Sequence, residues 1–290
     1  MSGMPRFWAF RLLMPVVGRF PGVFYPLANA LGWAMFRLNR QGRANVLSNL
    51  RPACSSDAEA RHHAARAFQH VARYYVDLAS TPHRDLAAFE LNHLTLLNEE
   101  RLPALFDPGP TIVLSAHVGN PEFALVAIAA RGRRFVELVE PLAPRRLAAY
   151  VTSLRQAGGG AVYETGRSGL RASMRTLRDG GLVAIMGDRD IHETGVCVTM
   201  FGRRVRLPRG PWELAQRTGA RVVPMLLTRG RGADQTVRVE EPICVPRGDA
   251  AAIETAAQSW ASLLEAHIRR DPGQWTVLED FWRVHGCGES

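Results

Sequence analysis

Lysine is absent from this sequence, and all 36 of its basic residues are arginine. The absence excludes a lysine Schiff base and the lysine of a Walker-type phosphate-binding loop. The four cysteines are far apart in the chain and form no Cys-x-x-Cys pair. We therefore predict neither a metal site nor a disulfide framework, and this cysteine usage favours a reducing compartment. The cysteines are Cys54, Cys197, Cys244 and Cys287.

Acidic residues are missing before Asp57, whereas seven arginines occupy the same stretch. Long hydrophobic runs are missing as well. The longest uncharged run, Phe20–Phe36, has 17 residues and contains two prolines, and a membrane-spanning helix needs about 20 apolar residues. Arginines also interrupt the apolar core that a cleavable signal would need. We expect residues 1–55 to form amphipathic helices in an anionic membrane surface, followed by a main domain over residues 56–290. The alternative is a buried helical hairpin that caps the main domain.

The remaining composition is that of a globular protein. The 290 residues, 47% hydrophobic and 22% charged, suffice for one large α/β domain or two small ones. The net charge of +9 predicts an anionic partner, which is a nucleic acid, an anionic membrane or a phosphorylated substrate. Arginine suits bidentate binding of phosphate and carboxylate. A coding bias would explain arginine in place of lysine, but not the sign of the charge.

Strands and helices alternate along most of the chain. The capping-box spacing of Ser56 and Glu59 predicts a helix to about Ala79, and residues 80–109 form a less regular link. From Thr111 the alternation predicts βαβ units, so the expected fold class is α/β, with a mixed, mainly parallel sheet covered by helices. The expected elements are 111–115, 121–130, 134–138, 144–156, 161–163, 168–178, 182–186, 196–201, 210–218, 221–227, 237–245 and a last helix from Asp249 to about Arg270.

The segment from Ser115 to Glu122 is the sharpest functional feature. An apolar run ends at His117, and a helix is expected from Pro121 with Asn120 as its N-cap. The histidine therefore lies at the carboxyl end of a strand, where open α/β sheets bind ligands. We predict that Glu122, in the first helical turn, orients the imidazole so that it can take a proton from an alcohol. The alternative is a structural histidine.

Further motifs accompany this pair and extend over nearly the whole chain. They are Arg43–Val46 with Asn49-Leu50, the block Gly187–Ile191, Gly195-Val196, Phe201-Gly202 and Leu207–Pro211, the segments Leu214–Ala220 and Val222–Pro224, and Gln274-Trp275. Together with His117-x4-Glu122, and in this order, they resemble the motifs of the bacterial glycolipid acyltransferases. That family includes the lipid A lauroyl and myristoyl acyltransferases and the phosphatidylinositol mannoside acyltransferases.

The resemblance implies further site residues. Glu140 and Arg155 correspond to a charged pair that flanks the family's active site, and Asp188, Arg189 and Asp190 to a segment that lines it. Glu140 and Asp188 each follow an apolar run, so both are expected at the same sheet edge as His117. A phosphate of the donor or the acceptor is a candidate ligand for the helix start at Arg167 and Ser168. Each of these residues has an alternative interpretation. The segment at Arg167 and Ser168 would then be an ordinary helix N-cap, Glu140 a solvated carboxylate in a loop, and Arg155 an arginine on a helix surface.

The resemblance also implies an activity. The expected reaction transfers a fatty acyl chain from acyl-CoA or acyl carrier protein to a hydroxyl of a membrane glycolipid, with no cofactor and no metal. The expected location is the cytoplasmic face of the bacterial inner membrane, with peripheral attachment and no nucleic-acid partner. A thioesterase that uses the same histidine and glutamate with water is one alternative. A non-enzymatic basic protein that binds lipid or nucleic acid is another, although the arginines are scattered and no aromatic-basic module is present.

Overall fold

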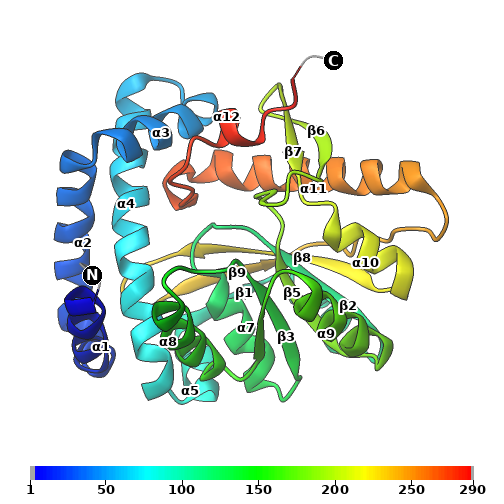
Figure 1. Ribbon diagram of the computed structural model, residues 1–290, viewed down its shortest axis with the longest axis horizontal. Coiled ribbons are helices and arrows are strands. Elements are labelled where there is room, and N and C mark those ends of the chain that lie inside the picture. The colour runs from blue at the N-terminus through cyan, green and yellow to red at the C-terminus, as the bar shows by residue number, and fades with distance from the viewer. Residues whose placement is uncertain (1–3, 289–290) are drawn as a thin grey trace.

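The computed structural model describes residues 4–288 and contains a seven-stranded sheet. The sheet lies at the centre of the fold, with helices around it (Figure 1). The strand order is β1-β9-β8-β2-β5-β3-β4. The β8–β9 pair is antiparallel, and the other neighbouring pairs are parallel. The predicted class, a mixed and mainly parallel α/β sheet, is thus confirmed. The strands are β1 (Leu94–Leu97), β2 (Thr111–Ser115), β3 (Phe135–Val139), β4 (Ala161–Glu164), β5 (Leu182–Met186), β8 (Arg221–Arg229) and β9 (Gln235–Val239).

Helices cover both faces of the sheet because its central strands are buried on both sides. In β2, Val113 belongs to one hydrophobic cluster, and its neighbours Ile112 and Leu114 belong to the other, as the alternation of side chains along a strand requires. The Val113 face packs against α5 (Leu86–His93), α7 (Pro121–Ala130) and α8 (Arg145–Gln156), and the opposite face against α9 (Arg167–Arg178), α10 (Gly210–Thr218) and α11 (Ala250–Arg270).

The first helices form a separate layer at one side of the sheet. They are α1 (Met4–Arg19), α2 (Pro21–Leu38), α3 (Arg40–Leu50) and α4 (Asp57–Ser80), and α2 runs along α4 (Figure 1). The predicted start of α4 is confirmed, because the Ser56 hydroxyl accepts the backbone N–H of Glu59. Between positions 4 and 288, no helix combines the length and the hydropathy that crossing a bilayer requires.

Large apolar side chains are exposed along α1 and α2, whereas a helix that only caps a domain would bury them. Leu12 and Val23 are 73% and 64% exposed. The same exposed set contains Trp8, Leu13, Val16, Phe20, Leu27, Leu31, Trp33 and Leu38.

Three segments differ from the sequence prediction. Residues 80–109 contain α5, β1 and α6 (Pro103–Phe106), and β1 forms the sheet edge beside β9, a pairing that no local pattern indicates. The expected strand over 237–245 is β9, which ends at Val239. A separate hairpin, β6 (Val196–Met200) and β7 (Arg203–Leu207), turns at Phe201 and Gly202, which both have positive φ, as a two-residue hairpin turn requires.

The remaining short helices are η1 (Arg51–Ala53), η2 (Thr81–His83), η3 (Glu99–Arg101), η4 (Pro272–Gln274) and α12 (Phe281–His285).

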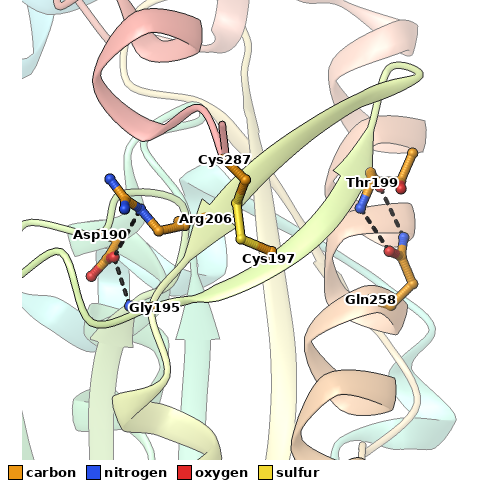
Figure 2. Close-up of a disulfide and its surroundings, with 7 residues drawn as sticks. All are labelled: Asp190, Gly195, Cys197, Thr199, Arg206, Gln258 and Cys287. Atoms are coloured by element: carbon orange, nitrogen blue, oxygen red, sulfur yellow. Dashed lines mark hydrogen bonds and ion pairs between the residues drawn. A yellow bond between two sulfur atoms is a disulfide. The ribbon is translucent and has the colours of Figure 1, made fainter. Parts of the chain in front are cut away.

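A disulfide joins Cys197 on β6 to Cys287 after α12, across 90 residues of sequence (Figure 2). The prediction that no disulfide forms was therefore wrong. The C-terminal segment crosses the β6–β7 hairpin, where Val205 forms an isolated bridge with Gly286, and this crossing brings the two sulfur atoms together. Spacing along the sequence gives no signal for a contact of this kind. Cys54 and Cys244 are free thiols.

Candidate active site

A cavity of about 920 Å³ opens at the carboxyl ends of β2, β3 and β5, and His117 lines it. The loop that carries the histidine runs from the end of β2 to α7. Asn120 caps α7 by accepting the backbone N–H of Glu122 at 3.2 Å, and Pro121 is the first helical residue, as predicted. Gly119 has φ 63°, and a Cβ there would lie 2.7 Å from the carbonyl oxygen of Leu227, so the loop requires glycine at this position.

Asp188 is the carboxylate that contacts the imidazole of His117. Its Oδ1 lies 2.8 Å from His117 Nδ1, and its Oδ2 accepts the backbone N–H of His117 at 3.0 Å and the indole N–H of Trp275 at 3.1 Å. The Asp188 side chain is fully buried, whereas 31% of the imidazole is exposed. Among residues 4–288, no group hydrogen-bonds His117 Nε2, so this nitrogen is available to a ligand in the cavity.

Strand register explains this contact. Ser115 at the end of β2 pairs with Met186 at the end of β5. His117 and Asp188 each follow two residues later, and the chains stay together because Gly187 donates its N–H to the Ser115 carbonyl at 2.8 Å. Two parallel neighbours therefore deliver their next polar side chains to one point of the sheet edge.

The electrostatics of the pair suit a base. Burial alone would lower the pKa of His117, but the charge and hydrogen bond of Asp188 outweigh it, and the net shift is upward. Burial would raise the pKa of Asp188, but the contacts with His117 and Trp275 lower it. The aspartate thus stays ionised and fixes the Nδ1–H tautomer, which leaves Nε2 as the proton acceptor.

Glu122 does not contact the imidazole, so the predicted contact was wrong. Its Oε1 accepts from Arg155 Nε at 2.7 Å and from the Tyr74 hydroxyl at 2.7 Å. Arg155 Nη2 also donates to the Tyr74 oxygen at 2.9 Å, and Glu137 lies 3.9 Å from Arg155. The first turn of α7 directs Glu122 towards α4 and α8, whereas the His117 ring faces β5. A catalytic role of Glu122 stays a prediction.

Arg189 binds two further carboxylates, and one of them, Glu140, lines the cavity. Its Nη1 donates to both oxygens of Glu140, at 2.7 and 2.9 Å, and its Nε and Nη2 donate to Glu279 at 2.6 and 2.9 Å. Glu279 also contacts His285 at 2.8 Å. The resemblance implied that Glu140 and Arg155 flank the site as a pair; both line the cavity, but each has a different partner.

The remaining predicted residues lie at the start of α9 and on the loop between β5 and β6. Arg167 lines the cavity and is exposed. Ser168 is exposed and is not among the lining residues, and it makes no side-chain cap. Asp190 lines the cavity, but its Oδ2 accepts the N–H of Gly195 at 2.7 Å and lies 4.0 Å from Arg206, contacts that Figure 2 displays.

Sequence reasoning missed four residues of the site. Trp275 belongs to a recognised motif, but its contact with Asp188 spans 87 positions. Tyr74 and Glu279 lie on segments without a site motif. Glu137 did give a signal, because it is a lone acidic residue inside the apolar strand Phe135–Val139.

The model of the family described as bacterial lipid A biosynthesis acyltransferase matches residues 3–284. The chain therefore belongs to this family of lipid acyltransferases. A phosphatidylinositol mannoside acyltransferase from Mycolicibacterium smegmatis is 29% identical over 215 residues, which span 73% of this chain and 69% of that protein. A protein of the same description from Mycobacterium tuberculosis is 31% identical over 189 residues, 63% of this chain and 58% of that protein.

One solved structure gives a fold comparison. The crystal structure of the 1-acyl-sn-glycerophosphate acyltransferase of Thermotoga maritima superposes with a TM-score of 0.40 and 14% identity, over 86% of this chain and 97% of that chain.

Proposed function

We propose that this protein transfers a fatty acyl chain from an acyl thioester to a hydroxyl of a membrane glycolipid, with His117 as general base. The observation that carries the proposal is the pair of His117 and Asp188 at the cavity. A buried carboxylate holds Nδ1, while the partly exposed ring lines the cavity and its Nε2 has no hydrogen-bond partner among the described residues. Such general-base catalysis contributes about 10²–10⁴-fold.

The reaction needs one addition and one elimination. His117 Nε2 takes the proton of the acceptor hydroxyl as its oxygen attacks the thioester carbonyl, and Asp188 stabilises the imidazolium that forms. The tetrahedral intermediate collapses, the carbon–sulfur bond breaks, and the imidazolium returns its proton to the leaving thiolate. Arg189, which follows Asp188 and lines the cavity, is our candidate for stabilising the oxyanion. No acyl-enzyme intermediate is required.

The acceptor is a lipid in the membrane surface, and we assign the docking to residues 1–55. The exposed apolar side chains of α1 and α2 enter the acyl region, and Arg11, Arg19 and Arg37 bind lipid phosphates. The ring of Phe10 on α1 packs edge-on against the ring of Tyr75 on α4, with 6.2 Å between the ring centroids, and Tyr75 lines the cavity. We therefore assign the entry of the lipid headgroup to the α4 side of the cavity, where Tyr75 lies. We place the protein on the cytoplasmic face of the inner membrane, without a nucleic-acid partner.

The two substrates approach from different sides. The names of the mycobacterial relatives suggest a phosphatidylinositol mannoside or a related glycolipid as acceptor. The donor is acyl-CoA or acyl carrier protein. Arg167 and Arg217, which line the cavity on the side of α9 and α10, suit the phosphate groups of the carrier.

The test is an assay of radiolabelled acyl-CoA, or acyl carrier protein, with vesicles that contain the glycolipid. We expect labelled glycolipid from the wild-type protein and none above background from His117→Ala, with an unchanged melting temperature. Release of free fatty acid alone would favour the thioesterase alternative. Transfer at a near-normal rate by His117→Ala would end the proposed mechanism.

A further inference from the structure

The cavity continues below the strand ends on the α7 and α8 side of the sheet. In register across β2, β5 and β3, Val113 pairs with Ala184, and Ala184 pairs with Glu137. All three residues line the cavity. Val113 lies four residues before His117, and a strand rises about 3.3 Å per residue, so this layer is about 13 Å below the imidazole. We call this part the apolar arm; its other lining residues are Ala124, Leu125 and Val139.

The apolar arm fits a hydrocarbon chain better than any polar ligand. Ala124 and Leu125 on α7 form its wall opposite the sheet, and both are buried. The layer below it is closed, because Phe135 and Leu182 pair across β3 and β5 and are buried. A chain that starts at His117 and enters the apolar arm must therefore end near Glu137.

A partition of four side chains closes the apolar arm. Behind it lies a second void of about 10 Å³, which is room for about one water molecule. The side chains that line both the cavity and this void are Glu122, Leu125, Glu137 and Arg155. Of these four side chains, Leu125 alone is apolar. The apolar arm therefore ends at a wall that is made mainly of polar groups.

The charges of this partition are internally balanced. Arg155 and Glu122 form a close ion pair with 17% and 13% of their side chains exposed. Burial, and then the neighbouring Glu122 charge, raise the pKa of Glu137 to about 8. At neutral pH Glu137 is therefore mostly protonated, and an uncharged carboxyl group beside a methyl end costs far less than a carboxylate would.

We propose that Glu137, held beside Arg155, ends the apolar arm and sets the length of the fatty acyl chain that the protein accepts. The proposal rests on the proposed function, because it assigns the apolar arm to the acyl chain of the donor. Glu137 acts here as a specificity residue through its volume, and takes no part in the chemical step.

The test measures binding rather than turnover, so it does not depend on the acceptor. S-acyl phosphopantetheines, the part shared by both carriers, are titrated by calorimetry into the full chain, from decanoyl to eicosanoyl. Wild-type affinity should peak at one length. Glu137→Ala removes the methylene and the carboxyl group beyond Cβ and joins the small void to the apolar arm. The peak should therefore move to a chain longer by about two carbons, with about tenfold tighter binding of that chain.

Two further variants frame the result. Ala184→Leu fills the same layer from β5 and should move the peak to a shorter chain. Glu164→Ala, which removes an exposed glutamate from β4, is the matched surface control and should keep the wild-type peak. If Glu137→Ala keeps the wild-type peak and melting temperature, the proposal is overturned. If Glu137→Ala does not fold, Ala184→Leu decides, and an unmoved peak overturns it. If wild-type protein binds no acyl thioester of any length, the proposed function itself fails.

Discussion

Two polar clusters share one cavity, and they differ in what they leave open. The first contains His117, Asp188 and Trp275. Two of the three hydrogen bonds of the aspartate go to His117 and the third goes to Trp275, and Nε2 of His117 has no hydrogen-bond partner among the described residues. In the second, Glu122, Arg155 and Tyr74 bind one another in a closed triangle. An open cluster can exchange a proton with a substrate, whereas a closed one fixes the position of the helices that carry it. We therefore propose that Asp188 serves the chemical step and that Glu122 serves the structure.

The largest expected difference between the clusters is in turnover. Asp188→Asn should lower kcat by about 10³–10⁴-fold, because the amide no longer fixes the Nδ1–H tautomer or stabilises the imidazolium. Glu122→Gln should lower kcat by about tenfold or less, because Arg155 retains Glu137 as a partner. The measurement is kcat under saturating donor and acceptor. Equal losses in both variants would contradict the division between the clusters.

Stability should show the reverse order. Arg155→Ala leaves the buried Glu122 without its cation, which typically costs about 3–5 kcal/mol. Asp188→Asn is isosteric and should cost about 1–3 kcal/mol at most. Urea unfolding followed by circular dichroism gives both free energies of unfolding. A Glu213→Ala variant, which breaks a half-exposed ion pair on α10, should change stability by less than about 1 kcal/mol and serves as the control.

Local signals predicted the parts of the site that depend on neighbouring residues. The end of β2, the Asn120 cap and the start of α7 all follow from residues within one turn of His117. The partner of the imidazole does not, because Asp188 reaches it through the register of β2 and β5, across 71 positions. The spacing of His117 and Glu122 suggested a contact, but it reports only that both lie at one sheet edge.

The same limit applies to the long-range parts of the fold. β1 pairs with β9 across more than a hundred positions, and the Cys197–Cys287 disulfide spans 90. Each depends on how the chain returns to the sheet or the hairpin, which periodicity does not encode. Glu137 is the opposite case: its charge inside an apolar strand was visible in the sequence, but its meaning required the cavity beside it.

The pH dependence of kcat/KM should distinguish the two clusters, because only a change in the first cluster should shift the pKa of His117. The folded pKa of His117 lies above its ordinary 6.5 because Asp188 outweighs burial, so kcat/KM should rise with pH through a value above 6.5 and level off at higher pH. In Asp188→Asn, burial lowers the pKa of His117 and no carboxylate charge opposes it. The rise of kcat/KM should therefore occur below pH 6.5, and its plateau should be much lower than in the wild type. Glu122→Gln should leave the pH at which kcat/KM rises unchanged. A shift of this pH in Glu122→Gln would place that carboxylate beside the base.

Within the open cluster, the smallest loss of kcat is expected at Trp275, whose indole helps to position Asp188. Trp275→Phe keeps the ring in the core but removes the N–H that donates to Asp188 Oδ2. A single hydrogen bond to a charged group contributes about 1.5–3 kcal/mol, but Oδ2 keeps the backbone N–H of His117, so kcat should fall by only about tenfold with KM unchanged. Trp282→Phe, which loses an indole contact to the Ser48 carbonyl away from the pair, is the matched control and should keep the wild-type kcat. If both variants lost activity equally, the C-terminal segment would act on the fold as a whole rather than on the position of Asp188.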